Sequence, residues 1–201
     1  MDPTPTKASL RAKVVARILA MNPLDRRRQE ATLVDRLSAL PGFDQAETVL
    51  LYASAFPEET ETAAMLAKAL ALGKRLALPT VTRRSKTLRL SVVADLSRDL
   101  RPGFRGIPEP SPECPLIDPS AVDWVLVPGL AFDESCRRLG RGAGCYDRLL
   151  PRLRPDAPRW ALILDPQWVA EVPVDGHDQP IDGVADAWRV VTGGRGSEVT
   201  S

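Results

Sequence analysis

The sequence predicts a single α/β domain of three layers, in which a mostly parallel sheet lies between helices. Short apolar runs alternate with amphipathic segments along the chain, which is typical of strand–helix–strand units. The 19 prolines and 13 glycines are spread between these segments rather than gathered in one linker. A chain of 201 residues is expected to form one domain and to bury about 70% of the surface of the unfolded chain. We therefore expect one domain over residues 1–192, followed by a polar tail over residues 193–201.

The first predicted element is an amphipathic helix. Thr4 followed by Pro5 is typical of a helix start, and the segment runs from there to Met21. Its apolar residues fall on one stripe, but Lys7 and Arg11 fall near the middle of the same stripe. Two interpretations are open, because these cations either extend past the end of the core or point into a cleft that binds an anion.

The remaining predicted elements alternate between helix and strand. A second helix covers residues 22–40 and is followed by strands at 49–52, 75–79, 88–92, 124–127, 160–164 and 187–191, with further helices at 62–72 and 146–153. The strand at 88–92 is expected at an edge of the sheet, and residues 100–119 are too rich in proline and glycine to assign. Because ligands bind at the carboxyl ends of parallel strands, we expect the functional residues in the loops that follow the strands.

Composition and charge exclude several classes of protein. The 27 Lys and Arg residues against 26 Asp and Glu residues leave a net charge of +1, which argues against a polybasic nucleic-acid-binding arm. The longest uncharged apolar run, residues 124–132, has about half the length of a membrane span. No export signal is visible, and three cysteines without a CxxC pair favour the reducing cytoplasm. We expect a cytoplasmic monomer that binds neither nucleic acid nor membrane.

The richest candidate site is the loop over residues 137–148. It carries a glycine at every second position from 140 to 144, directly before a predicted helix. Backbone N–H groups and a helix N-terminus can then approach an anion. Arg138 and Arg141 supply positive charge, and Asp147 at the start of the helix is placed to hold a metal ion between phosphate oxygens. The loop therefore predicts a polyphosphate site, with a glycine turn and solvated arginines as the alternative.

Two other nucleotide motifs fit this loop less well. A Walker A loop requires Gly-Lys-Ser/Thr, which is missing here. A dinucleotide-binding loop requires GxGxxG, but Cys145 stands where the third glycine is needed. Asp165 has the spacing of the ribose-binding acid of such a loop. We nevertheless reject a dinucleotide-dependent dehydrogenase, because the loop begins well after its strand and carries several arginines.

A second polar cluster follows the strand at 49–52. Residues 58–62 place acids next to threonines, which is typical of a helix N-terminus. An acid at the carboxyl end of a strand can also accept hydrogen bonds from a ligand, so both roles are open. His177, the only histidine, has no serine or cysteine motif directed to it, and we expect a surface role rather than a catalytic triad.

The chain carries a series of landmarks over residues 7–186 that resembles a known family. In order they are Lys7-x-x-x-Arg11, Glu59-x-Glu61-Thr62, GIPEP at 106–110, VPGLAFD from 127, RLGRGAGCYD at 138–147, Pro173 and His177-Asp178. This series is similar to that of the 5-formyltetrahydrofolate cyclo-ligases, also called methenyltetrahydrofolate synthetases. The resemblance implies a ligase of one-carbon metabolism that uses ATP and Mg²⁺ to close 5-formyltetrahydrofolate, free or polyglutamylated, to 5,10-methenyltetrahydrofolate. ADP and phosphate would be released. Such phosphoryl transfer asks the protein mainly for positioning and charge neutralisation.

The resemblance also implies roles for individual residues. Arg138, Arg141 and Asp147 would be catalytic. ATP would be bound by Lys7, Arg11, Arg138, Leu139, Gly140, Arg141, Gly142, Ala143, Gly144, Cys145 and Tyr146. The folate would be bound by Tyr52, Ser54, Glu59, Ile107, Pro108 and Tyr146, and Mg²⁺ by Asp147 and Asp178.

Three departures from the family pattern stand out. Cys145 replaces a frequent tyrosine, Ala143 stands where some members have lysine, and one extra residue between Ser54 and Glu59 makes Glu58 an alternative pterin ligand. These departures motivate one other interpretation, in which the chain is a relative that binds nucleotide or folate without catalysis.

Overall fold

The strands form one twisted eight-stranded sheet at the centre of the molecule. The structure is a computed structural model that describes residues 6–82, 85–103 and 106–193. The strand order is β12-β11-β10-β7-β1-β2-β3-β6, and the five strands from β11 to β2 are parallel. The strands at either end are antiparallel to their neighbours. The bounds are β1 Thr48–Leu50, β2 Arg75–Thr82, β3 Thr87–Val93, β6 Leu116–Ile117, β7 Trp124–Leu126, β10 Arg159–Leu162, β11 Gly183–Ala185 and β12 Val190–Thr192.

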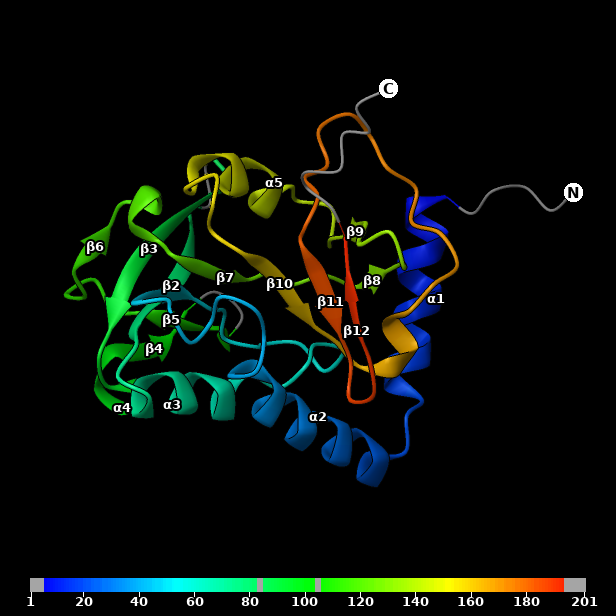
Figure 1. Cartoon of the computed structure of the whole chain (residues 1–201), viewed down its shortest axis with the longest axis horizontal. Coiled ribbons are helices and arrows are strands. Elements are labelled where there is room, and N and C mark those ends of the chain that lie inside the picture. Colours follow the sequence, from blue (N-terminus) through cyan, green and yellow to red (C-terminus); the bar gives the residue numbers. More distant parts are fainter. Residues whose placement is uncertain (1–5, 83–84, 104–105, 194–201) are drawn as a thin grey trace, which may run out of the picture.

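Two short ribbons and the helices complete the fold. The ribbons pair β4 (Leu100–Pro102) with β5 (Pro108–Pro110) and β8 (Ala131–Phe132) with β9 (Arg138–Leu139). The α-helices are α1 Lys7–Leu19, α2 Pro23–Leu37, α3 Ala63–Ala71, α4 Leu96–Asp99 and α5 Cys145–Leu149, and the 3-10 turns are η2 Pro119–Ala121, η3 Leu150–Arg152 and η4 Asp165–Gln167. Figure 1 shows α2 and α3 on one side of the sheet and α5 on the other. The predicted three-layer α/β/α class is confirmed.

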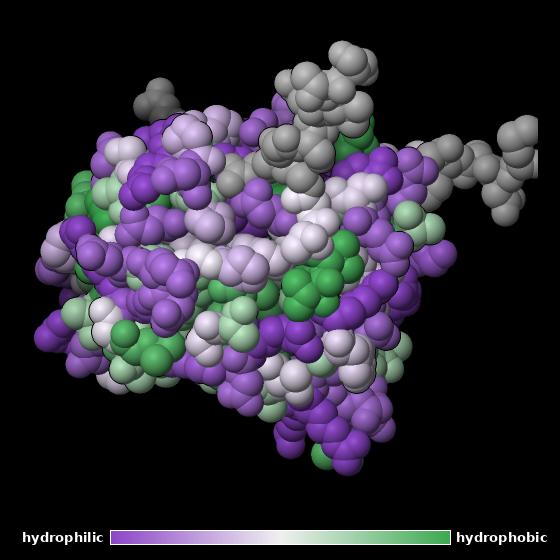
Figure 2. Space-filling model, in the orientation of Figure 1, coloured by the Kyte–Doolittle hydropathy of each residue, from purple (hydrophilic) through white to green (hydrophobic). Residues whose placement is uncertain are grey.

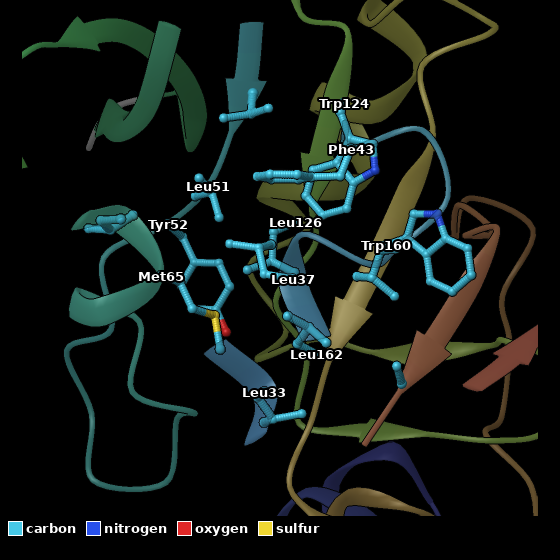
Figure 3. Close-up of a cluster of buried hydrophobic side chains, with 14 of the residues drawn as sticks. Leu33, Leu37, Phe43, Leu51, Tyr52, Met65, Trp124, Leu126, Trp160 and Leu162 are labelled. Atoms are coloured by element: carbon cyan, nitrogen blue, oxygen red, sulfur yellow. The ribbon is translucent and has the colours of Figure 1, made fainter. Parts of the chain in front are cut away.

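Alternate residues of the central strands face opposite layers. In β1 and the residue after it, Val49 and Leu51 pack with the buried side chains of α1, α2 and α3, whereas Leu50 packs with those of α5 and η3. This is the period of two that a strand imposes on its side chains. The first cluster also holds Trp124, whose indole N–H donates to the carbonyl of Pro41 and whose ring meets Phe43 edge to face. Figure 3 shows part of this cluster: Leu33, Leu37, Phe43, Leu51, Tyr52, Met65, Trp124, Leu126, Trp160 and Leu162.

The helix starts agree with the sequence more closely than the helix ends. Asn22 caps α2 as predicted, because its side chain accepts from the N–H of Leu24. The cap of α1 is Thr6, which accepts from the N–H of Ser9, and the predicted start at residues 4–5 lies outside the described residues. The second helix ends at Leu37 rather than at residue 40, because turns bonded back to residues 36 and 37 replace the helical pattern.

Further predicted bounds need correction. The last strand lies at 190–192 rather than 187–191, because Asp186 accepts from the N–H groups of Trp188 and Arg189 and bends the chain there. The helix predicted to run to Leu153 leaves α-geometry after Leu149, where Pro151 has no N–H for the helical ladder. The strand β3 is not an edge strand, because β6 pairs beside it. Neither β6 nor β11 was predicted, since two or three residues are too short for a periodic signal.

The strand order places a topological switch point at β1. From β1 the chain continues to β2 on one side, and it returns later to β7 on the other side. The loops after β1 and β7 therefore run in opposite directions and leave a crevice between them. Open α/β sheets bind ligands in a crevice of this kind. The face of the molecule seen in Figure 2 is largely hydrophilic, with small separate hydrophobic areas. Across the described ranges, the helices lack the combination of length and apolar character that crossing a bilayer requires.

Candidate active site

A cavity of about 720 Å³ opens at the switch point. Its walls come from the loops after β1 and β7, the start of α1, the β2–β3 hairpin, the turn before β5, the glycine loop and the turn at 175–178. Every site residue implied by the resemblance, except Ser54, lines it. These are Lys7, Arg11, Tyr52, Glu59, Ile107, Pro108, Arg138, Leu139, Gly140, Arg141, Gly142, Ala143, Gly144, Cys145, Tyr146, Asp147 and Asp178. The tertiary structure thus brings together site residues from five separate segments.

Backbone conformation explains two of the glycines in the loop. Gly142 has φ of +100° and Gly144 has φ of +65°, in the left-handed region that favours glycine. The loop is attached to α1, because Nε of Arg11 donates to the carbonyl of Gly140 at 2.8 Å. The prediction that Lys7 and Arg11 face a cleft is confirmed, since both cations line the cavity.

Arg138 is a buried cation between the glycine loop and α5. Its guanidinium donates to Asp147 Oδ1 and to the carbonyl of Pro128, at 2.5 and 3.3 Å. Its side chain is 5% exposed, against 14% for Asp147. Among the described residues, Nε of Arg138 and the hydroxyl of Tyr146 are buried without a hydrogen-bond partner. Both residues line the cavity, and buried polar groups are normally satisfied, so these two atoms point to a polar ligand.

The two tyrosines of the cavity stay neutral. Burial, reinforced by the nearby charge of Glu59, raises the pKa of Tyr52 well above its ordinary value. Burial also raises the pKa of Tyr146, and the neighbouring Tyr52 adds to the effect. Both hydroxyls are therefore protonated throughout the physiological range and available as hydrogen-bond donors.

Lys7 carries its charge into the cavity but is already paired. Its ammonium donates to Asp175 and Asp178, at 2.7 and 2.5 Å. Burial opposes the charge, yet the two carboxylates outweigh it and raise the pKa of Lys7. The pKa of Asp178 is lowered, because the hydrogen bond from Lys7 and others outweigh the effect of its burial. An anionic ligand at this end of the cavity would compete with Asp175 and Asp178 for the ammonium group of Lys7.

Arg141 forms the other ion pairs of the cavity wall. Its Nε donates to Glu59 at 3.0 Å and its NH1 to Glu58 at 2.7 Å. The guanidinium carbon lies 4.1 Å from the centre of the Phe56 ring. The second oxygen of Glu59 accepts from the N–H groups of Ala55 and Phe56. Arg141 therefore joins the glycine loop to the loop after β1.

Of three further residues considered from the sequence, Ser54 and Asp165 do not line the cavity, whereas His177 does. The hydroxyl of Ser54 donates to Glu61, whose carboxylate in turn accepts from the first N–H of α3. The cap of α3 is thus made by Glu61 and not by the side chain of Thr62, which donates to the carbonyl of Tyr52. Asp165 is exposed in η4 and does not line the cavity, in agreement with the rejection of a dinucleotide site. His177 lies at the rim, 74% exposed.

Sequence reasoning missed four residues at or beside the site, and three of them had no recognisable signal. Phe56 and Asp175 contact cations of the cavity, and Arg148 lines its rim and donates to the carbonyls of Lys86 and Ala143. Arg26 of α2 donates to two carbonyls of the loop after β1. Only Asp175 had a usable signal, because it stands in the turn that contains the landmark at 177–178. The others are apolar or basic residues in ordinary surroundings, and only the packing shows their role.

The carboxylates present fit a magnesium ion that is held partly by phosphate. Asp147 and Asp178 both line the cavity. Within the described ranges, no three His, Cys, Asp or Glu residues gather to form a metal cage. Mg²⁺ is commonly bound through one or two carboxylates together with substrate phosphates and water rather than by a complete protein cage. The donor set is therefore consistent with magnesium that arrives with a nucleotide.

The glycine loop is rich in arginine and lies beside a partly apolar pocket at the switch point. This arrangement is typical of α/β enzymes that bind phosphorylated ligands. The comparisons narrow this class. The model of the 5-formyltetrahydrofolate cyclo-ligase family matches residues 3–186, and the chain belongs to that family.

Relatives from distant organisms agree with this assignment. The 5-formyltetrahydrofolate cyclo-ligase of Mus musculus is 26% identical and the alignment covers 89% of this chain and 92% of the mouse protein. The enzyme of Escherichia coli K12 is 28% identical over 85% of this chain and 94% of its own length. The structure of the 5,10-methenyltetrahydrofolate synthetase of Aquifex aeolicus superimposes with a TM-score of 0.80 at 31% identity, covering 92% of each chain. The synthetase of Mycoplasma pneumoniae, at 20% identity and a TM-score of 0.72, shares the fold.

Proposed function

We propose that this chain closes 5-formyltetrahydrofolate to 5,10-methenyltetrahydrofolate with ATP as co-substrate, releasing ADP and phosphate. The observation that carries the proposal is the one cavity in which the glycine loop, the unpartnered Nε of Arg138 and the unpartnered hydroxyl of Tyr146 meet the apolar wall of the β2–β3 hairpin. Polar groups on one side suit a phosphate chain, and the wall of Val81 and Leu88 suits the flat ring of a pterin.

The reaction needs two displacements. The formyl oxygen on N5 attacks the γ-phosphorus of ATP, the bond to the β–γ bridging oxygen breaks, and ADP leaves. N10 then attacks the formyl carbon, and the carbon–oxygen bond to phosphate breaks as the ring closes and N10 loses its proton. The protein supplies position and charge neutralisation, and no covalent nucleophile of the chain takes part.

The residues of the cavity divide between the two substrates. Lys7, Arg11 and the loop from Arg138 to Tyr146 would bind ATP, with Arg138 and Arg141 neutralising charge at the transferred phosphate. Tyr52, Glu59 and the turn at 107–108 would bind the folate, with Glu59 accepting from the N–H groups of the pterin and the raised pKa keeping Tyr52 a neutral donor. Of Glu58 and Glu59, the second is the better pterin ligand, because it lines the cavity and Glu58 does not.

Asp147 and Asp178 would hold Mg²⁺ when it enters with ATP. The ion would neutralise negative charge on the phosphate oxygens. In the free chain these carboxylates are paired with Arg138 and Lys7, so both ion pairs would loosen when metal and nucleotide bind. We also propose that the chain works as a cytoplasmic monomer with one domain over residues 1–192. Its three cysteines form no disulfide, which suits a reducing compartment.

One assay tests the proposal. Purified protein with 5-formyltetrahydrofolate, ATP and Mg²⁺ should form the methenyl product, followed by its near-ultraviolet absorbance, and a chelator should abolish the change. Asp147→Asn should need more Mg²⁺ for half-maximal rate, with Asp156→Asn as a control on the surface. Folded protein that binds ATP and 5-formyltetrahydrofolate without forming product would refute the proposed reaction. That result would favour the non-catalytic relative.

A further inference from the structure

Arg141 and Glu59 lie in two loops that are far apart in the sequence, yet their side chains form an ion pair with each other. Their side chains are 35% and 16% exposed, and the two residues are separated by 82 positions along the chain. Both oxygens of Glu59 are engaged, one by Arg141 and the other by the N–H groups of Ala55 and Phe56. A pterin N–H that approaches the outer oxygen of Glu59 therefore competes with Arg141 for that oxygen.

Glu58 strengthens this pairing from outside the cavity. It binds NH1 of Arg141 at 2.7 Å, is 13% exposed and does not belong to the cavity wall. Burial of Glu58 acts to raise its pKa, but the hydrogen bond from Arg141 and further favourable interactions outweigh burial, so the pKa is lowered. Glu58 is thus a charged partner of Arg141 at neutral pH. Its contacts are with the protein and not with the space that the substrates would fill.

A ligand that recruits either member of the pair therefore weakens the same contact. Phosphate oxygens that attract Arg141 leave Glu59 free for the pterin, and a pterin that takes Glu59 loosens Arg141 for phosphate. The first ligand to bind does the work of separating the two loops, and the second ligand binds without that cost. Thermodynamic linkage requires the effect to be equal in both directions.

We propose that Glu58, Glu59 and Arg141 form a latch that joins the glycine loop to the loop after β1 and couples the binding of ATP to the binding of 5-formyltetrahydrofolate. The proposal rests on the proposed function, because it uses the roles given there to Glu59 and Arg141. Glu58 is a positioning residue that acts through Arg141. Its removal should make each substrate bind more tightly alone while reducing the coupling between the two.

The test is a set of calorimetric titrations of the full chain with two probes, 5-formyltetrahydrofolate and the non-hydrolysable β,γ-imido analogue of ATP with Mg²⁺. Couplings of this kind commonly fall between 5- and 150-fold. We expect saturation with one probe to tighten the other by roughly fivefold to tenfold in the wild-type chain. The factor should be the same whichever probe is added first.

Glu58→Gln removes the charge of the latch but preserves the size of the side chain. We expect this variant to bind each probe alone several-fold more tightly, with the coupling factor reduced towards one. Glu61→Gln is the matched control, because it removes the same charge from the same loop but contacts Ser54 and the start of α3 instead of Arg141. It should keep the coupling of the wild-type chain.

The outcomes separate the latch from the proposed function. Independent binding of the two probes to the wild-type chain would overturn the latch and leave the proposed function standing. Unchanged coupling in Glu58→Gln would also overturn it, because the coupling would then come from contact between the ligands. Failure of the wild-type chain to bind either probe would overturn both.

Discussion

Arg138→Ala tests the phosphate site most directly. Arg138 is 5% exposed, lines the cavity and has a buried Nε without a hydrogen-bond partner. A hydrogen bond that involves a charged group contributes about 1.5–3 kcal/mol. At about 1.4 kcal/mol for each factor of ten, the loss of 2–3 kcal/mol lowers the affinity for nucleotide by roughly 30- to 150-fold. We therefore predict that Arg138 contributes a measurable share of ATP binding.

The same substitution also affects stability, which must be measured separately. Truncation leaves the carboxylate of Asp147, 14% exposed, without its cation. Because Asp147 keeps some contact with water and with the N–H of Gln179, the cost should be about 2 kcal/mol, below the 3–5 kcal/mol of a fully buried pair. Urea unfolding measures this cost, and calorimetric titration with the imido analogue of ATP measures the affinity.

Two control variants sharpen the experiment. Arg138→Lys retains the charge but not the forked contact with Asp147 and Pro128, so it should fall between the wild-type chain and Arg138→Ala. Arg152→Ala removes an exposed arginine of η3 that does not line the cavity, and it should leave affinity unchanged. Folded Arg138→Ala that binds nucleotide within threefold of the wild-type affinity would refute the assigned role.

Three further predictions concern stability and the loop. Because the folded chain raises the pKa of both Tyr52 and Tyr146 above the model-compound value of 10.0, it keeps protons that the unfolded chain loses; stability should therefore be unaffected below that pH and fall above it. The free energy of unfolding should fall by about 1.4 kcal/mol per pH unit for each tyrosine. These two residues are the only tyrosines of the chain. In an alkaline titration, tyrosinate absorbance should therefore appear only together with unfolding. Gly142→Ala forces a side chain into φ of +100° with Arg11 3.5 Å away, and it should cost about 1 kcal/mol or more in thermal unfolding and weaken nucleotide binding; unchanged nucleotide affinity would argue against this conformation. Trp124→Ala empties a fully buried site and should lower the free energy of unfolding by about 3–5 kcal/mol in urea, whereas a loss below 1 kcal/mol would contradict the packing.

Much of the fold follows from short-range patterns. The stripe of Leu10, Val14 and Ile18 predicted α1, and these residues are buried. Apolar runs predicted β1, β2, β7 and β10 to within a few residues, because each has enough residues for its composition to show. By contrast, β6 and β11 have two and three residues. Strands of this length exist only because a neighbouring strand supplies their hydrogen bonds.

The candidate site also combines features that local sequence patterns predict with contacts that they do not. The position of Lys7 and Arg11 on the apolar stripe left an anion-binding cleft as one of two interpretations, and the glycines of the loop from 140 to 144 predicted a polyphosphate site. These are local signals, because a helix face and a left-handed turn are set by a few neighbouring residues. The partners of these cations belong to distant segments. No local pattern indicates that Lys7 binds Asp175, or that Arg141 binds Glu58 and Glu59 and covers Phe56.

The sequence by itself determined the three-layer class, the order of most elements and the loops that carry the charged residues, because periodicity and turn residues act over a few positions. Only the tertiary structure decided which loops meet, since that depends on the order of strands around β1. It also decided that Lys7, Arg138 and Arg141 are paired with carboxylates. Lys7 and Arg141 meet their partners because the fold brings distant segments together, and the energy of each pair depends on burial, which is a property of the whole molecule.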